Sequence, residues 1–370
     1  MNGFRNAKTY IRGKGIVRAD IGFENGRIVF GGDITPVAQT GDCLLVPGFT
    51  DSHIHGAGGA DTMDGGDALS VISKALVREG TTSFLATTMT QSADNIKRAL
   101  GAVKDTEGGA RLLGVHLEGP FISDKHIGAQ PREFIKKPDI EFFKELQTSS
   151  GGMIKIVTLA PEEDGGLVEY LSSHGVIPSA GHSGATCAQI ADAMEKGLSR
   201  VTHTFNAQTP LHHREVGVVG AALLYDGLYC EVIADTVHVS VPALKLLIKN
   251  KPKDKLVLIT DAIRAKGMPD GISELGGQTV YVGDGTARLK DGTLAGSVLK
   301  MNEAVKNLVE KCGAGIEYAV DCASYNPAKS LGLDDCGIIK EGARADFTLL
   351  DNNFEVMLTV VGGKTVYIKE

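Results

Sequence analysis

Near its beginning and its end, the chain has short apolar–polar alternations separated by glycine-containing turns. Such alternation is typical of small antiparallel sheets. The predicted strands are Phe4–Ile11, Gly15–Phe23, Arg27–Phe30, Asp346–Leu350, Val356–Val361 and Lys364–Ile368. Because both ends share this pattern, we expect them to pair into one small β-domain, which requires the two termini to lie close together.

Between these ends, strand-like apolar runs alternate with helical patterns. The predicted strands are Leu44–His55, Thr82–Thr88, Leu112–Glu118, Ile154–Ala160, Ile177–His182, Arg200–Asn206, Tyr229–His238 and Leu256–Asp261. Apolar residues spaced three and four apart predict helices between several of them, such as Ala68–Glu79 and Thr186–Lys196, each followed by glycine. This order predicts an α/β fold with a parallel (β/α)₈ TIM-type barrel. An open doubly wound sheet is the alternative.

The alternation stops after residue 262, where a hairpin-bearing insertion is predicted over Gly271–Leu299. The elements predicted in this part are strands Thr279–Val282 and Ala287–Leu289, helices Met301–Cys312 and Ile316–Ser324, and a short helix after Pro327. The expected division of the chain is therefore a small β-domain from residues 1–45 and 338–370, and a (β/α)₈ barrel from residues 46–337.

Composition narrows the classes of function. The 370 residues carry a formal net charge of −7, which gives no overall attraction to nucleic acid or to anionic membranes. No apolar run approaches the ~18 residues of a membrane span, and the N-terminus does not resemble a signal peptide. The six cysteines form no CxxC pair, so we expect reduced thiols in a cytoplasmic protein.

Side chains that bind metal ions lie at the ends of the predicted barrel strands. They are His53, His55, Glu118, His182, His203 and Asp261. In a barrel the carboxyl ends of all strands meet at one face, where active sites lie. Each residue alone could be a hydrogen-bonded anchor of its loop, but their convergence predicts a metal site. Imidazole and carboxylate ligands suit zinc, iron(II), manganese or cobalt.

These residues stand in segments that resemble the amidohydrolase superfamily and, within it, the sugar-phosphate deacetylases. The matching segments are PGFTDSHIHG (47–56), HLEGPFIS (116–123), AGHS (180–183), THTFNA (202–207), PLHHRE (210–215), ADTVH (234–238), TDA (260–262) and DGTLAGS (291–297). They follow one another across most of the chain. The resemblance implies a (β/α)₈ barrel with a small β-domain built from both termini.

The resemblance also implies a metal-dependent reaction. Glu118, His182 and His203 would hold the main metal, and His53 and His55 a second one, so that the chain would carry one or two divalent ions, zinc or iron. The implied reaction is hydrolysis of the acetamide of N-acetylglucosamine 6-phosphate to glucosamine 6-phosphate and acetate. A metal-activated water would attack the carbonyl, and Asp261, the last residue of the predicted strand Leu256–Asp261, would act as general base.

The substrate contacts that the resemblance implies come from four segments. They are Ala129 and Gln130, then Asn206, Ala207 and Arg214 for the phosphate, His238 for the sugar, and Leu294, Ala295 and Gly296 for the acetyl group. We expect a homodimer in which Arg214 reaches the neighbouring site, and a surface salt bridge of Arg214 with Glu215 or a nearby acid is the alternative. Many relatives have Gly-Ala-His-Pro where this chain has Gly-Ala-Gln-Pro, and in them the histidine helps to polarise the substrate carbonyl. We expect the second metal at His53 and His55 to replace this effect by sharing the charge of the oxyanion.

Other functions remain open at the level of sequence. A deacetylase of N-acetylgalactosamine 6-phosphate is the nearest alternative, and a dihydroorotase-like enzyme or an N-acyl amino acid deacylase is more distant. A non-enzymatic alternative is an inactive regulator that binds a sugar phosphate. The complete set of ligands together with Asp261 favours an enzyme.

Overall fold

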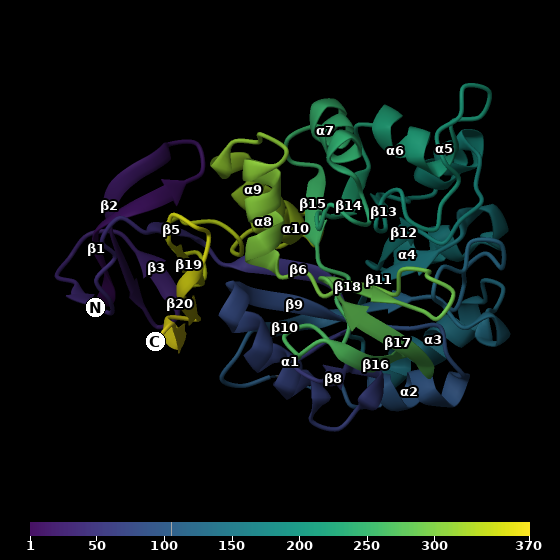
Figure 1. Ribbon diagram of the computed structural model, residues 1–370, viewed down its shortest axis with the longest axis horizontal. Helices are drawn as coiled ribbons and strands as arrows, with labels where there is room; N and C mark the ends of the chain where they lie inside the picture. Colours follow the sequence, from purple (N-terminus) through teal and green to yellow (C-terminus); the bar gives the residue numbers. More distant parts are fainter. Residues whose placement is uncertain (105) are drawn as a thin grey trace.

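A parallel sheet of eight strands forms the centre of the computed structural model, which describes residues 1–104 and 106–370 (Figure 1). In sheet order its strands are β6 (Phe49–Ile54), β9 (Thr81–Thr88), β10 (Arg111–Glu118), β11 (Ile154–Leu159), β12 (Ile177–Ala180), β13 (Arg200–Val201), β14 (Tyr229–Ile233) and β15 (Leu256–Ile259). At the carboxyl ends of β6 and β15, the His53 carbonyl accepts a hydrogen bond from the Asp261 amide, and the His55 amide donates to the Ala262 carbonyl, both at 2.9 Å. These bonds bring the first and last strands together, which confirms the predicted barrel over an open sheet.

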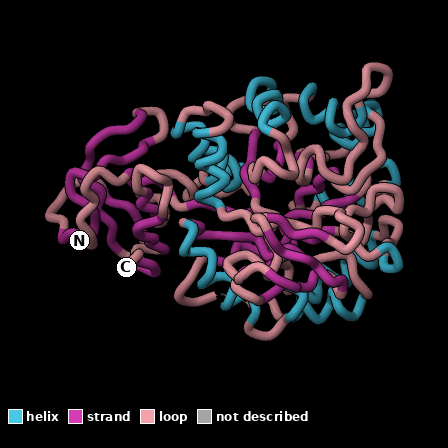
Figure 2. Tube along the Cα trace, viewed as in Figure 1, coloured by secondary structure: helices cyan, strands magenta, loops and turns pink. Residues whose placement is uncertain are grey.

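Helices follow the barrel strands and surround them (Figure 2). They are α1 (Ala68–Leu76), α2 (Ala93–Gly101), α3 (Ile140–Ser149), α4 (Leu167–Ser173), α5 (Cys187–Glu195), α6 (Gly217–Leu224), α7 (Val241–Asn250), α8 (Met301–Glu310), α9 (Ile316–Ala323) and α10 (Tyr325–Ser330). Short 3₁₀ turns are η1 (Thr62–Asp64), η2 (Val77–Glu79), η3 (Arg132–Phe134) and η4 (Pro161–Glu163). The predicted helix Thr186–Lys196 matches α5, whose N-cap Thr186 accepts a hydrogen bond from the Gln189 amide.

The barrel strands are buried on both faces, as expected for a parallel sheet that helices cover. Every residue of β6, β9 and β15 is buried. Among the described residues, no helix combines the length and the apolar character that crossing a membrane requires.

Strands from both ends of the chain form a second sheet beside the barrel (Figure 1). Its members are β21 (Lys364–Ile368), β20 (Val356–Val361), β19 (Phe347–Leu350), β5 (Leu44–Pro47), β1 (Asn2–Ile11), β2 (Gly15–Glu24) and β3 (Arg27–Val29), with β4 (Thr35–Pro36) beside β1. The Phe4 and Phe347 rings pack edge to face with centroids 5.6 Å apart, joining the two ends of the chain. This confirms the expected small β-domain, whereas its boundaries at residues 45 and 338 stay a prediction.

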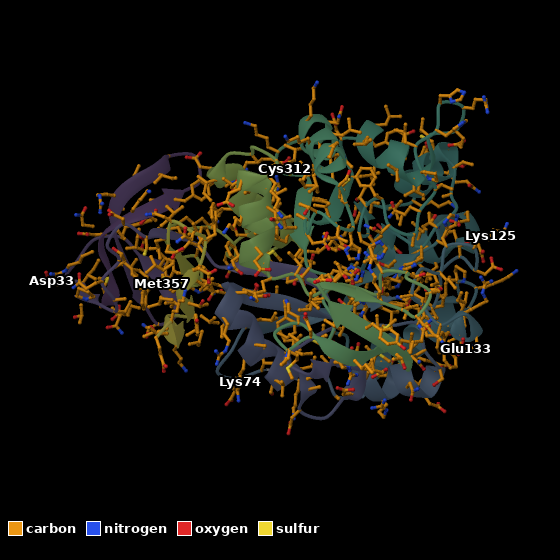
Figure 3. All side chains as sticks on the ribbon, in the orientation of Figure 1. Asp33, Lys74, Lys125, Glu133, Cys312 and Met357 are labelled. Atoms are coloured by element: carbon orange, nitrogen blue, oxygen red, sulfur yellow. The ribbon has the colours of Figure 1, made fainter. Side chains whose placement is uncertain are left out.

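The molecule is extended along the line that joins the two sheets. Figure 3 shows Asp33 and Met357 at the end formed by the small sheet, and Lys125 and Glu133 at the opposite end. Lys125 and Glu133 belong to the long connection that follows β10, so this connection lies away from the chain termini.

The predicted strand Leu44–His55 is wrong as a single element. Residues 44–47 form β5 in the small sheet, residues 49–54 form β6 in the barrel, and Gly48 separates them. A Cβ atom at Gly48 would overlap the Thr82 side chain of β9, with Thr82 Cβ at 2.7 Å. Glycine therefore allows the chain to leave one sheet and enter the other at close approach.

The insertion after β15 has one more strand than predicted. It is a three-stranded antiparallel sheet of β16 (Gly271–Leu275), β17 (Gln278–Gly283) and β18 (Thr286–Arg288), where two strands were expected. Its Leu275 and Val280 form an apolar cluster with Met89 and Ile263, two residues that follow barrel strands. A further pair of two-residue strands, β7 (Gly56–Ala57) and β8 (Ala60–Asp61), follows β6.

Candidate metal centre and active site

Glu118, the last residue of β10, lies at the centre of the side chains expected to bind metal. Its Oε1 atom is 3.2 Å from His182 Nε2 and 3.0 Å from His203 Nε2. The two histidines follow β12 and β13, and their Nε2 atoms are 3.1 Å apart. All three side chains are buried, so three potential ligand atoms converge on one small volume.

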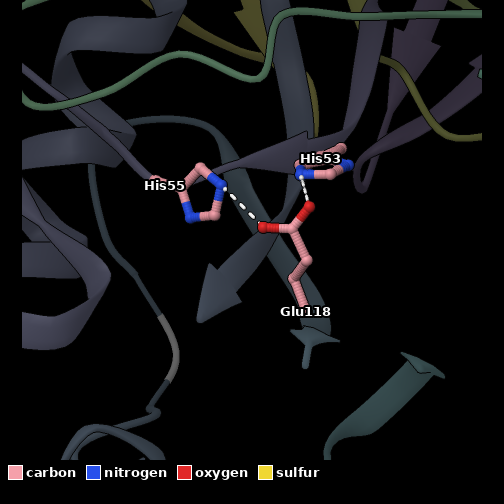
Figure 4. Close-up of side chains that lie close together, drawn as sticks. All are labelled: His53, His55 and Glu118. Atoms are coloured by element: carbon pink, nitrogen blue, oxygen red, sulfur yellow. Dashed lines mark ion pairs between the residues drawn. The ribbon is translucent and has the colours of Figure 1, made fainter. Parts of the chain in front are cut away.

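A second group of ligand atoms also lies close to the Glu118 carboxylate (Figure 4). His53 and His55 come from β6 and the residue after it, and their Nε2 atoms lie 3.4 Å and 3.3 Å from Glu118 Oε1 and Oε2. Asp261, which follows β15, has its Oδ1 atom 3.4 Å from His53 Nε2 and 3.1 Å from His55 Nε2. The structure thus brings together all six residues singled out in the sequence, and Glu118 contacts residues of both groups.

The hydrogen bonds on the outer nitrogens show that the donor set fits a divalent cation. His182 Nδ1 is 2.9 Å from the His126 carbonyl and His53 Nδ1 is 3.0 Å from a Glu231 carboxylate oxygen. Carbonyl and carboxylate oxygens only accept, so both Nδ1 atoms donate and both Nε2 atoms of the neutral rings carry a lone pair. The buried His53 Nε2 has no hydrogen-bond partner in the described part of the chain. Lone pairs of this kind directed at one point, with carboxylate oxygens, are typical of zinc and iron sites.

The electrostatics of the cluster also favour bound positive charge. Burial alone would lower the pKa of His53, but the Asp261, Glu118 and Glu231 carboxylates outweigh burial and raise it to about 9. Burial would raise the pKa of Glu118, yet His53 and the other histidines hold it well below its usual range. His53 therefore holds an extra proton at neutral pH when no cation is bound, and a cation that binds its Nε2 atom must displace that proton.

Three of the proposed ligands have an unusual backbone conformation. His182, His203 and Asp261 have φ angles of 48°, 29° and 48°, in the left-handed region that residues other than glycine rarely adopt. Each such residue costs of order 1–3 kcal/mol, and such residues cluster at functional sites. The predicted strand Arg200–Asn206 accordingly ends early, because β13 stops at Val201 and left-handed residues follow it.

His116 lies on the same strand as Glu118, but its ring is hydrogen-bonded to groups outside the metal-binding cluster. Its Nδ1 is 3.1 Å from the Ser52 carbonyl and its Nε2 is 2.7 Å from the Thr158 hydroxyl, so both ring nitrogens are occupied. Burial lowers the pKa of His116 to about 3, which keeps the ring neutral. These contacts favour a structural role within the barrel.

Two charged residues that were not predicted from the sequence lie next to the cluster. Arg200 on β13 and Glu231 on β14 are both completely buried, and Arg200 Nε donates to Glu231 Oε1 at 2.8 Å. Glu231 also accepts from His53, as described above. The available signals were an arginine at the start of the predicted strand Arg200–Asn206 and a glutamate within the first residues of the predicted strand Tyr229–His238.

A cavity of about 210 Å³ opens directly above the cluster and is lined by most of the residues expected to bind substrate. Those that line it are Ala129, Gln130, Asn206, Ala207, His238, Leu294 and Gly296, together with His55, Glu118, His182, His203 and Asp261. Ala295 is fully buried in the apolar cluster under the three-stranded sheet instead. Four further lining residues were not predicted from the sequence: Met89, Gly128, Leu275 and Thr293. Of these, Gly128 lies in the Gly-Ala-Gln-Pro segment and Thr293 in the DGTLAGS segment.

Two lining side chains are held in place by neighbouring acids. The Gln130 amide nitrogen donates to Glu118 Oε2 at 2.6 Å, and its amide oxygen accepts from the Thr90 backbone at 2.8 Å. His238 Nδ1 donates to Asp235 at 2.6 Å, which leaves Nε2 as the free nitrogen of that ring. Gln130 therefore supports the central Glu118 as well as lining the cavity.

Arg214 is the expected substrate residue that the structure does not bring to the cavity of its own chain. It is exposed, and its Nη1 atom is 2.8 Å from His213 Nε2 in a loop between β13 and α6. Glu215 accepts hydrogen bonds from the Cys187 and Gly217 amides, so the salt bridge considered for Arg214 is not formed. In this position Arg214 does not line the cavity of its own chain.

Comparison with known proteins agrees with this geometry. A model described as the amidohydrolase family matches residues 44–366. The chain is 47% identical over 340 residues to a Bacillus subtilis (strain 168) protein named N-acetylglucosamine-6-phosphate deacetylase, covering 89% of this chain and 86% of that one. It is 38% identical over 329 residues to an Escherichia coli O157:H7 protein named N-acetylgalactosamine-6-phosphate deacetylase, covering 87% of each. The crystal structure of N-acetylglucosamine-6-phosphate deacetylase from Thermotoga maritima superposes with a TM-score of 0.90 at 38% identity, over 99% of this chain and 100% of that chain.

These matches confirm the resemblance that the sequence motifs carry. They span both sheets of the molecule and include every residue of the cluster around Glu118. The chain belongs to the amidohydrolase family.

Proposed function

We propose that the protein hydrolyses the acetamide of N-acetylglucosamine 6-phosphate to glucosamine 6-phosphate and acetate. The observation that carries this proposal is the position of Asp261, which lines the cavity and also lies within 3.4 Å of both His53 and His55. A carboxylate placed between a cation site and a substrate cavity can exchange protons with a reacting water. The names of the Bacillus subtilis and Thermotoga maritima relatives supply the substrate.

Two groups of residues would hold the metal. Glu118, His182 and His203 form one set, and His53 and His55, with Glu118 and Asp261 beside them, form the other. Zinc or iron is the proposed metal. When bound, such an ion polarises a carbonyl and makes water a nucleophile at neutral pH.

The chain's own residues then move the proton and hold the substrate. Burial alone would raise the pKa of Asp261, but His53 and His55 outweigh burial and lower it, so the carboxylate is ionised and ready to accept. As the water oxygen bonds to the acetamide carbonyl carbon, Asp261 takes the water proton. It then donates that proton to the nitrogen as the C–N bond breaks, which yields acetate and the free amine. His238, with Nδ1 fixed by Asp235, presents Nε2 to a sugar hydroxyl.

The phosphate requires a cation that the cavity does not supply. Among the described residues that line the cavity, none is a lysine or an arginine. Arg214 is exposed and free to reach outwards, and arginine is well suited to phosphate because its fork of donors is planar. We therefore propose a homodimer in which Arg214 of each chain completes the phosphate site of the other, beside Asn206 and Ala207.

An acetate-release assay on the two amino-sugar phosphates tests the proposed function. The protein should release acetate from N-acetylglucosamine 6-phosphate, and a chelator should abolish release until zinc or iron is restored. Faster turnover of N-acetylgalactosamine 6-phosphate would transfer the assignment to the activity named for the Escherichia coli relative. Binding of either sugar phosphate without acetate release, in a metal-loaded sample, would favour the inactive regulator.

A further inference from the structure

A buried carboxylate lies directly behind both proposed groups of metal ligands. Glu231 on β14 is completely buried, and its Oε2 atom is 3.0 Å from His53 Nδ1. The same oxygen accepts a hydrogen bond from the His203 backbone amide at 3.3 Å. One side chain therefore touches a residue of each group without lying in the substrate cavity.

The contact with His53 decides which nitrogen of that ring can bind a cation. An ionised carboxylate only accepts hydrogen bonds, so His53 Nδ1 must carry the ring hydrogen. In the neutral ring that a cation requires, the lone pair then lies on Nε2, the atom 3.4 Å from both Glu118 and Asp261. Acceptors on the outer nitrogen of metal-bound histidines generally fix both the tautomer and the orientation of the ring.

The contact with His203 supports a strained backbone. His203 has a φ of 29°, and the next residue, Thr204, donates its amide to the Glu231 carbonyl at 2.8 Å. Two consecutive amides beyond the end of β13 are thus held by the one residue on β14. This holds the His203 ring where its Nε2 lies 3.0 Å from Glu118.

Arg200 prevents the Glu231 carboxylate from turning away. Its Nε donates to Glu231 Oε1 at 2.8 Å, and its two terminal nitrogens donate to the Ser330 and Ser52 hydroxyls. Ser52 precedes His53 on β6, and Ser330 is the last residue of α10. The guanidinium therefore ties the carboxylate to the strand that carries His53.

We propose that Glu231 is a positioning residue that sets His53 and His203 for metal binding, and that Arg200 holds Glu231 in that position. The proposal rests on the proposed metal centre and adds to it two residues that touch neither substrate nor metal. Removal of the Glu231 carboxylate should mainly affect the ion held by His53 and His55, because His53 is the ligand whose tautomer Glu231 fixes.

Metal affinity of a Glu231→Gln variant tests the proposal without relying on activity. Glutamine keeps the size of the side chain but loses the charge and offers an amide that can donate. We expect metal affinity to fall about 10- to 100-fold and the ion near His53 to be lost first, measured as metal per chain at fixed free metal concentrations. Glu79→Gln is the matched control, because Glu79 is also a buried carboxylate paired with a cation, Lys266 at 2.7 Å, and contacts none of the proposed ligands.

The unfolding midpoint, measured with and without metal, separates positioning from general destabilisation. Glu79→Gln should lower the midpoint of the metal-free protein and leave the rise caused by metal unchanged, whereas Glu231→Gln should reduce that rise. Wild-type affinity in Glu231→Gln, or equal losses in both variants, would overturn the proposal.

If Glu231→Gln does not fold, two further measurements decide the question. Glu231→Asp keeps the charge beside Arg200 but withdraws the carboxylate from His53, and it should also bind metal more weakly than wild type. In the wild-type holoenzyme, ¹⁵N spectra of the histidines should show His53 protonated on Nδ1, and a proton on Nε2 would contradict the proposal. A wild-type protein that binds no metal would refute the proposed function itself.

Discussion

At the scale of single residues, protons and metal ions compete for the same imidazole nitrogens. The carboxylates around His53 raise its pKa to about 9, so without metal the ring is protonated at neutral pH, whereas a ligand must be neutral. Metal affinity should therefore rise with pH between about 6 and 9, by up to about tenfold per unit for each proton displaced. Competition with a chelator at several pH values measures this, and calorimetry in buffers of different ionisation enthalpy counts the protons released. Affinity that does not change across this range would contradict the charge assignment.

Asp261 provides a second prediction at this scale. If its carboxylate carries the proton between water and amine, Asp261→Asn should lower kcat by about 10²- to 10⁴-fold and leave KM for the sugar phosphate within a few-fold of wild type. Metal per chain must be measured in the same sample, because Asp261 also lies 3.1 Å from His55 Nε2. Asp270→Asn, a change of an exposed aspartate after the same strand, is the control and should be near wild type. Normal turnover by a fully metal-loaded Asp261→Asn protein would remove Asp261 from the reaction.

The cluster itself was predictable from sequence, because polar residues at the ends of apolar strands stand out. His182 and His203 are examples, and the structure brings both rings to the Glu118 carboxylate. Glu231 was missed because its contacts are with residues distant in sequence, and only the fold reveals them. Ala295 was expected in the cavity, yet its side chain turns to the apolar cluster while its neighbours Leu294 and Gly296 line the site.

At the scale of elements, Gly48 controls the passage of the chain from the small sheet to the barrel. A Cβ atom there would overlap Thr82 on β9, and neither β5 nor β6 can move without leaving its own sheet. Gly48→Ala should therefore lower the free energy of unfolding by about 1–3 kcal/mol, as overpacking usually does. Denaturant unfolding measures the change.

The matched control for this prediction is Gly101→Ala at the end of α2, where an added Cβ meets nothing within 4 Å. That variant should be within about 0.5 kcal/mol of wild type. Equal stability of the two variants would show that the junction can relax, and that the break in the strand has another cause.

Element boundaries were less predictable from sequence than element types. The apolar run from Leu44 onwards continues across two sheets, and only one glycine marks the division. β13 is shorter than predicted because His203, Phe205 and Ala207 adopt positive φ without any glycine to announce it. Tertiary contacts, such as the bond from the His203 amide to Glu231, impose that conformation. Local propensity therefore carries no sign of it.

At the scale of the whole molecule, the barrel and the terminal sheet were both expected from the order of strands and helices. The order of strands and helices does not indicate which loops line the cavity of their own chain and which project away from that cavity. Arg214 illustrates the limit, because its segment PLHHRE resembles those of related enzymes while its side chain is exposed beside His213. Where a partner chain would bind depends on the surface of the folded protein, and no repeating pattern in the sequence indicates it.

The proposed exchange of Arg214 between chains makes a prediction about a single variant. Arg214→Ala should raise KM for the phosphorylated sugar about 10- to 100-fold, because a hydrogen bond to a charged group contributes about 1.5–3 kcal/mol. The unphosphorylated sugar should be affected little, and kcat at saturation should be retained. Arg5→Ala, at an exposed arginine of β1 in the small sheet, is the control.

Mixing two defective proteins then distinguishes contact within a chain from contact between chains. In a hybrid dimer of Asp261→Asn and Arg214→Ala chains, one site would contain both the intact Asp261 of its own chain and the intact Arg214 of the other. Activity at low substrate concentration should therefore reappear after the subunits are mixed and allowed to exchange, approaching one quarter of the wild-type rate per chain for random pairing. If Arg214 instead serves its own chain, no hybrid has a complete site and the mixture stays as inactive as its parts. Sedimentation of the wild-type protein as a monomer at assay concentrations would contradict the exchange directly.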